Sequence, residues 1–182
     1  MHDMTAGNLR SAYGGESMAH MRYIAWGVKA EKEGFPNVGR LFKAVSFAEQ
    51  IHATKHFKAM KDVAGDFGVC AGGGFGLGST SENLAGAIGG EHFEVNEMYP
   101  AYIQVAQLQQ EAKAEKSMTH ALAAEKIHEA MYNKAKQAVD AGKDMELGPV
   151  QVCDHCGYTT EGEIPDKCPL CGAGKDRFKT FA

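Results

Sequence analysis

Four cysteines near the end of the chain constrain its fold more than any other feature. They form two Cys-x-x-Cys pairs, Cys153–Cys156 and Cys168–Cys171, which are separated by eleven residues and each followed by a glycine. A pair with this spacing can turn both sulfurs toward one point, so two pairs can complete a tetrahedral cage for one metal ion. Because roughly thirty residues bury too little core to fold alone, we expect the metal to stabilise this tail.

The composition argues against several classes of function. The 182 residues include 19 basic and 23 acidic side chains, a net charge of −4, which does not indicate a nucleic-acid-binding surface. No apolar run approaches the roughly 20 residues that span a bilayer, and the N-terminus lacks the regions of a signal peptide. Four of the five cysteines have the spacing of metal ligands, so we expect a reducing, cytoplasmic location. The fifth, Cys70, is expected to be an inert small residue.

The first 145 residues are predicted to form four long helices. Apolar residues recur at helical spacing over residues 5–33, about 37–64, about 80–112 and about 114–141. Seven glycines fall within residues 65–80 and indicate a long flexible connection. Two short connections and one long one predict two antiparallel hairpins joined by a crossover, the layout of a ferritin-like four-helix bundle. Pro100 should kink or unwind the third helix, or else divide it in two.

Two copies of a Glu-x-x-His motif, at residues 49–52 and 125–128, lie on the second and fourth predicted helices. The i, i+3 spacing puts both side chains of each motif on one helix face. The first helix adds Glu16, and the third adds Glu94 and Glu97. Glu16 precedes the first motif by 33 residues and Glu94 precedes the second by 31, which is a weak internal repeat. One glutamate from each of two helices, with Glu-x-x-His from the other two, is the pattern that binds a pair of iron or manganese ions.

The alternative for each motif is a solvated helix face. A second copy on an alternate helix favours metal binding, because buried carboxylates without a metal would repel one another and take up protons. Glu91, one turn before Glu94, competes with it as the ligand of the third helix. Tyr23 and Tyr102 lie seven and eight residues after Glu16 and Glu94, so we expect their hydroxyls to hydrogen-bond ligand carboxylates, with simple packing as the alternative. The histidines not expected to bind metal are His20, His56, His92, His120 and His155.

Together these motifs resemble the rubrerythrin family, in which a ferritin-like di-iron bundle precedes a rubredoxin-like domain. The resemblance covers nearly the whole chain and is carried by residues 15–23, 48–52, 90–100, 124–128 and the four cysteines. It implies a mainly α fold, with a bundle over residues 1–145 and a rubredoxin-like four-cysteine iron domain over residues 150–182. The glycine-rich connection departs from the family pattern. Whether helix pairs are exchanged between subunits across residues 65–80 stays open.

The resemblance also implies a role for each site residue. The implied core ligands of the two irons are Glu16, Glu49, Glu94, Glu125 and His128. Of these, Glu49 and Glu125 would bridge the irons. The other iron would exchange Glu97, when oxidised, for His52, when reduced. A neutral imidazole that replaces a carboxylate keeps a buried site near neutrality as electrons arrive. Catalytic roles are therefore assigned to His52, Glu97, Tyr23 and Tyr102.

The activity that the resemblance implies is the reduction of hydrogen peroxide to water, in oxidative stress defence, with electrons relayed through the tetrathiolate iron. Two other hypotheses stay open, namely a ferroxidase or iron-handling ferritin-like protein and a zinc-stabilised helical scaffold without enzymatic activity. A four-cysteine cage alone is more typical of structural zinc, and zinc could occupy either site in recombinant protein. The expected partners are peroxide, a donor such as rubredoxin or a flavin reductase, and a second subunit. In the implied homodimer, the tail of one subunit approaches the bundle of the other.

Overall fold

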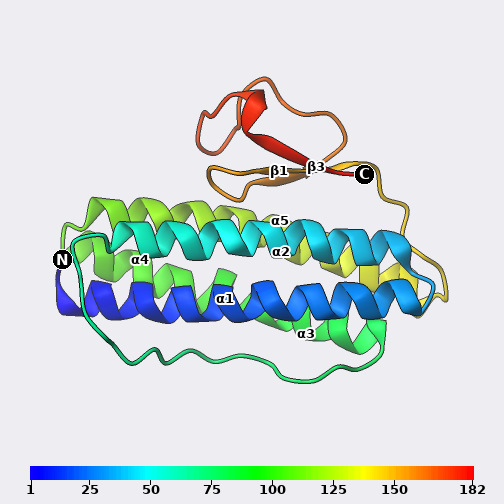
Figure 1. The fold of residues 1–182 in the computed structure, drawn as a ribbon, viewed down its shortest axis with the longest axis horizontal. Coiled ribbons are helices and arrows are strands. Elements are labelled where there is room, and N and C mark those ends of the chain that lie inside the picture. Colours follow the sequence, from blue (N-terminus) through cyan, green and yellow to red (C-terminus); the bar gives the residue numbers. More distant parts are fainter.

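A computed structural model describes all residues from 1 to 182 (Figure 1). The helices of the bundle are α1 (Asp3–Lys32), α2 (Pro36–Ala59), α3 (Thr80–Phe93), the π-helical turn η1 (Glu94–Met98), α4 (Tyr99–Leu108) and α5 (Ala112–Asp140). Helices α1 and α2 form one antiparallel hairpin, and α3–η1–α4 forms a second with α5 (Figure 1). The predicted mainly α, ferritin-like four-helix bundle is therefore confirmed. None of the helices is both long and apolar enough to cross a membrane.

Local sequence explains where the hairpins turn. Gly34 adopts a left-handed backbone (φ 90°) between α1 and α2, and Pro36 then occupies the first position of α2, where its missing N–H is harmless. Helix α3 begins with a capping box, in which the Ser79 hydroxyl accepts from the Glu82 N–H and the Glu82 carboxylate accepts from the Ser79 N–H. These signals fix the helix ends that bring the two hairpins together.

The connection between α2 and α3, residues 60–79, crosses the outside of the bundle along α1 (Figure 1). We call this segment the strap. Helix α2 ends at Ala59, a few residues earlier than predicted. The indole Nε1 of Trp26 donates to the Gly76 carbonyl at 2.9 Å, and the Arg10 guanidinium lies 4.5 Å from the centre of the Phe67 ring. The strap is thus attached to α1 near both of its ends.

The third helical rod contains a single π turn at the position where Pro100 was predicted to disturb it. Backbone angles stay helical from Glu94 (φ −64°, ψ −41°) to Tyr99 (φ −66°, ψ −40°), so the rod is continuous. A π turn inserts one extra residue and shifts the faces of the helix that follows. Because proline cannot donate a backbone hydrogen bond, the wider turn before Pro100 accommodates it without dividing the helix.

Two apolar clusters fill the ends of the bundle and leave a polar layer between them. One cluster includes Trp26, Phe42 and Tyr132, and the other includes Leu9 and Met118. Along α1, α2 and α5, the residues between the two clusters are buried glutamates and histidines. The bundle therefore removes this layer from water, which is the condition for a metal site with low dielectric surroundings.

The tail forms a small antiparallel sheet with strand order β2–β1–β3. Its elements are β1 (Val150–Cys153), β2 (Thr159–Glu161), the 3-10 turn η2 (Lys175–Arg177) and β3 (Phe178–Phe181). Val150 and Val152 of β1 pack on Ala44 and Ala48 of α2. The sheet therefore lies directly on the bundle of its own chain, above α2 and α5 (Figure 1).

Candidate metal centres

The buried polar layer contains two groups of four metal-binding side chains. The groups are Glu16, Glu49, His52 and Glu125, and Glu49, Glu91, Glu125 and His128. Within each group, one ligand atom of every residue lies within 4.8 Å of the others. Because Glu49 and Glu125 belong to both groups, the geometry fits two ions bridged by two carboxylates.

Each bridging glutamate divides its oxygens between the two histidines. Glu49 Oε2 lies 3.0 Å from His52 Nδ1, and Glu49 Oε1 lies 3.3 Å from His128 Nδ1. Glu125 Oε1 lies 2.8 Å from His52 Nδ1, and Glu125 Oε2 lies 2.7 Å from His128 Nδ1. The two Glu-x-x-His motifs therefore meet face to face, as the repeat in the sequence predicts.

A tyrosine hydroxyl holds each of the two terminal glutamates. Tyr23 donates to Glu91 Oε1 at 2.8 Å, and Tyr99 donates to Glu16 Oε1. The remaining oxygens, Glu91 Oε2 and Glu16 Oε2, are buried without a hydrogen-bond partner. An unpaired buried carboxylate oxygen is costly, and these two oxygens lie where a metal ion would satisfy them. The oxygen and imidazole donors suit iron or manganese, so the residues present fit a dinuclear centre.

The carboxylates and imidazoles of the buried layer shift one another's pKa values. Burial alone would raise the pKa of Glu16, but the imidazoles of His52 and His56, each with a ring nitrogen 3.8 Å from a Glu16 oxygen, hold it well below its usual range. The pKa of His52 lies well above 6.5, because the charge of Glu125 outweighs the effect of burial. Burial raises the pKa of Glu49 to about 7, and it also raises that of Glu91. The carboxylates and imidazoles of this layer therefore interact strongly with one another.

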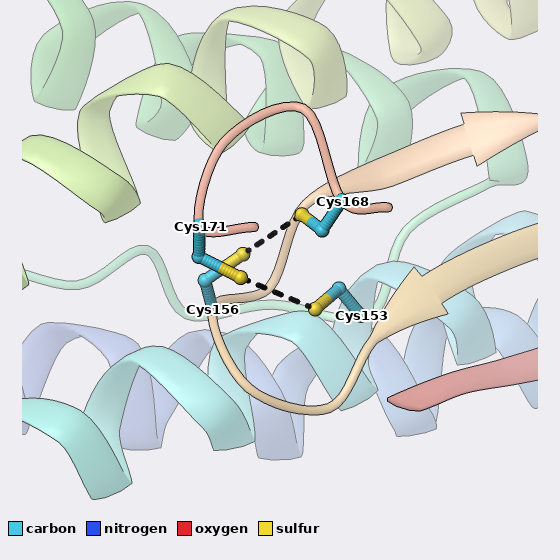
Figure 2. Close-up of side chains that lie close together, drawn as sticks. All are labelled: Cys153, Cys156, Cys168 and Cys171. Atoms are coloured by element: carbon cyan, nitrogen blue, oxygen red, sulfur yellow. Dashed lines mark hydrogen bonds between the residues drawn. The ribbon is translucent and has the colours of Figure 1, made fainter. Parts of the chain in front are cut away.

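The four cysteine sulfurs point toward one another in the tail (Figure 2). Cys153 Sγ lies 3.8 Å from Cys171 Sγ, and Cys156 Sγ lies 3.6 Å from Cys168 Sγ. Sulfurs bound tetrahedrally at about 2.3 Å from a metal are about 3.8 Å apart, so the cage has the required size. A hydrogen bond from Cys156 lowers the pKa of Cys153 to about 5. One thiolate is thus already favoured before a metal binds.

Comparison with known proteins agrees with this pair of centres. The family model for rubrerythrin matches residues 7–136, and the model for the rubredoxin-like domain of rubrerythrin matches residues 151–179. The chain belongs to the rubrerythrin family. It is 48% identical to Rubrerythrin-2 of Clostridium acetobutylicum over 98% of this chain and 97% of the relative. It is 33% identical to nigerythrin of Nitratidesulfovibrio vulgaris, over 97% and 86% of the two chains.

A solved structure supports the same assignment. The structure of nigerythrin in its fully reduced, all-ferrous state matches with a TM-score of 0.86 and 31% identity, over 100% of this chain and 88% of that one. The chain is therefore a rubrerythrin-family di-iron protein of the oxidoreductase type with a C-terminal rubredoxin-like domain. Its dinuclear carboxylate–histidine centre and its four-cysteine centre are the two sites described above.

The structure does not bring every predicted rubrerythrin residue into the centre. The side chain of Glu97 is exposed and belongs to neither metal-binding group. Glu91 takes the terminal position that was predicted for Glu94. Glu94 itself is partly exposed beside the His52 end, and burial, then the charge of Glu16, raises its pKa. On this rod, the residue that lies in a metal-binding group is thus one turn nearer the N-terminus than the predicted one.

The same correction applies to the predicted tyrosines. Tyr23 hydrogen-bonds a ligand carboxylate, although its partner is Glu91. Tyr102 instead donates to Ser11 Oγ at 3.1 Å, and Tyr99 takes the expected position beside the centre. In a regular α-helix, the residue seven positions after Glu91 would lie on the same helix face as Glu91. The π turn adds one residue, so the eighth position, Tyr99, lies on that face instead.

His56, which was expected not to bind metal, supports the ligands from behind. Its Nε2 lies 2.9 Å from the Tyr99 hydroxyl, and its Nδ1 lies 2.9 Å from Ser117 Oγ. Since Tyr99 donates its proton to Glu16, its oxygen accepts from His56. His155 of the tail is partly buried, and its Nε2 lies 3.4 Å from Lys55 Nζ.

Proposed function

We propose that this protein is a non-haem di-iron peroxidase. Hydrogen peroxide would accept two electrons and two protons at the dinuclear centre and leave as two molecules of water. The observation that carries the proposal is the contact between a dinuclear carboxylate centre and a tetrathiolate cage, in which Gly157, next to Cys156, packs against the His52 ring. Two irons held by the carboxylates and histidines would supply two electrons to one substrate, and an iron held by the four cysteines would supply the replacement electrons one at a time.

A cavity of about 330 Å³ lies beside the dinuclear centre, and its size favours a small substrate. It is lined by Glu94 and Tyr102, by the glycine-rich strap, and by Gly15 and Gly90, the residues before the terminal ligands Glu16 and Glu91. A water molecule occupies roughly 30 Å³, so the cavity holds peroxide with several waters. Because glycines flank the ligands here, no side chain separates the cavity from the centre at these two positions.

Two groups beside this cavity would handle protons and charge. Burial, then the charge of Glu16, raises the pKa of Glu94, which favours this carboxyl group as a proton donor beside the cavity. Glu94, rather than Glu97, would alternate with His52 as a ligand. Glu94 lies at the His52 end of the centre and belongs to neither of the two groups of metal-binding side chains. The Tyr99 hydroxyl, bonded to Glu16, would orient that ligand and relay a proton to it.

The cellular setting belongs to the same proposal. We infer a cytoplasmic protein in oxidative stress defence, with rubredoxin or a flavin reductase as the electron donor and with a homodimer as the working form. The cysteine spacing supports a reducing compartment. A donor protein would deliver electrons to the cage near Cys171, because Cys171 is the one ligand of the four that is partly exposed.

Anaerobic stopped-flow kinetics on protein of measured iron content tests the activity. The reduced protein should be reoxidised by hydrogen peroxide much faster than by dioxygen. Faster reoxidation by dioxygen, with ferrous ions consumed as substrate, would favour the ferroxidase instead. A colourless protein that retains zinc in both sites and ignores peroxide would favour the helical scaffold, because a ferric tetrathiolate is red.

A further inference from the structure

The tail contributes a side chain to the dinuclear centre of its own chain. Thr159 of β2 is fully buried, and its Oγ1 lies 2.9 Å from Nε2 of His128. This is the outer nitrogen of the ring, because Nδ1 faces Glu125 and Glu49. The contact therefore joins a strand of the rubredoxin-like domain to a ligand of the bundle from behind.

The hydrogen bonds around Thr159 determine the tautomer of His128. The Thr159 hydroxyl donates to the Gly157 carbonyl at 3.0 Å, and a carbonyl can only accept. The hydroxyl proton is thus already committed, so the Thr159 oxygen must accept from Nε2–H of His128. With the proton on Nε2, the lone pair of Nδ1 is directed at the bridging carboxylates, where a metal would lie.

The other histidine of the centre has no such support. His52 Nε2 is buried without a hydrogen-bond partner, and it faces the Cα of Gly157, where an added Cβ would lie only 2.0 Å from it. The outer nitrogen of one imidazole is thus hydrogen-bonded to a side chain of the tail, whereas the outer nitrogen of the other has no hydrogen-bond partner. This difference fits a centre with one fixed and one exchangeable histidine.

We propose that Thr159 is a positioning residue for the dinuclear centre, and that docking of the tail on its own bundle fixes His128 as a permanent ligand. The proposal rests on His128 as a metal ligand, but it does not depend on the identity of the oxidant. Outer partners of metal-bound histidines commonly change metal affinity by about 10- to 100-fold. Tail docking and metal retention by the bundle are therefore coupled in this chain.

Three variants test the coupling. Thr159→Val keeps the branched shape but loses the hydroxyl, Thr159→Ser keeps the hydroxyl, and Thr160→Val changes the next residue, whose side chain has no such contact with the centre. Ferrous-loaded proteins are challenged anaerobically with a ferrous chelator. In Thr159→Val, one of the two bundle ions should be lost about 10- to 100-fold more readily. Thr159→Ser and Thr160→Val should resemble the wild type, and the tetrathiolate spectrum should persist in all three.

Nitrogen-15 NMR of histidine in the zinc-loaded wild-type protein provides a test that needs no variant. His128 should show a proton on Nε2 and metal at Nδ1. The proposal is overturned if Nε2 binds the metal, if Thr159→Val retains both ions like the wild type, or if Thr159→Ser loses them as Thr159→Val does. None of these measurements uses peroxide turnover. If the peroxidase proposal fails, the loss of metal from Thr159→Val and the NMR result for His128 are still expected.

Discussion

Glu49 and Glu125 lie opposite each other, and each presents one carboxylate oxygen to His52 and the other to His128. The two halves of the centre therefore have the same set of bridging ligands, since each half supplies one Glu-x-x-His motif. What differs between the halves is their surroundings. The His128 half contacts Thr159, and the His52 half lies near Glu94.

Metal loading should release protons from this centre. The pKa of His128 is raised to about 9, because hydrogen bonding to Glu125 outweighs the effect of burial, and that of His52 is also raised. Both are therefore protonated without metal at neutral pH and must lose a proton to bind it. As the pH falls from about 9 toward 6, protons compete better and zinc affinity should fall. Calorimetry in buffers of different ionisation enthalpy should detect at least one proton released per histidine. Affinity that does not change over this range would contradict the assignment.

The sequence predicts most of this centre because its motifs are local. Glu-x-x-His spacing places two ligands on one helix face, and two cysteine pairs define a cage without any knowledge of the fold. On the third rod, the sequence favours Glu94 whereas the metal-binding group contains Glu91, because helical spacing alone does not distinguish two glutamates one turn apart. A signal was nevertheless present, since Glu16 and Glu91 both follow a Gly-Gly pair, and Glu91 precedes Glu125 by 34 residues, close to the 33 from Glu16 to Glu49.

Long-range contacts account for what the sequence alone did not predict. Thr159 is distant from His128 in the chain, and no local pattern marks a threonine of a strand as the partner of a bundle histidine. Docking of the tail depends on matching small residues, Ala44 and Ala48, to Val150 and Val152. Such complementarity is a property of two assembled surfaces, so only the folded chain shows it.

Glu94, and not Glu97, should be needed for peroxide turnover. Glu94→Gln removes an ionisable carboxyl group beside the His52 end, and we expect turnover to fall by about 10- to 100-fold. Glu97→Gln changes an exposed side chain of the same rod and serves as the matched control. Steady-state peroxidase assays at equal iron content measure both. Slow rates in both variants would favour the assignment predicted from sequence, in which Glu94 is a core ligand and Glu97 exchanges with His52. A normal rate in Glu94→Gln would contradict the role proposed for Glu94.

A larger side chain at Gly15 should obstruct the cavity. A Cβ at this position meets no other atom within 4 Å, so Gly15→Leu can be accommodated in helix α1 while its branches extend into the space beside Glu16. We expect kcat/KM for peroxide to fall by about tenfold, or about 1.4 kcal/mol of barrier. Gly89→Leu, at an exposed helical glycine that also has free space, controls for the general effect of replacing glycine. Equal kinetics in the two variants would show that substrate enters elsewhere.

Electron transfer between the centres should depend on Gly157. This residue has a left-handed backbone (φ 82°), and an added Cβ would lie 2.0 Å from His52 Nε2, so Gly157→Ala forces the cysteine knuckle away from the bundle. Gly172 occupies the same position after the second cysteine pair, with φ 76° and no atom within 4 Å of an added Cβ. Gly172→Ala therefore carries only the backbone cost of about 1–2 kcal/mol, and it controls for that cost in Gly157→Ala. Rapid-mixing spectroscopy should show slower reduction of the dinuclear centre by the tetrathiolate in Gly157→Ala alone, with the red colour of the tetrathiolate retained. If both variants transfer electrons at the wild-type rate, the contact between Gly157 and His52 is not the route.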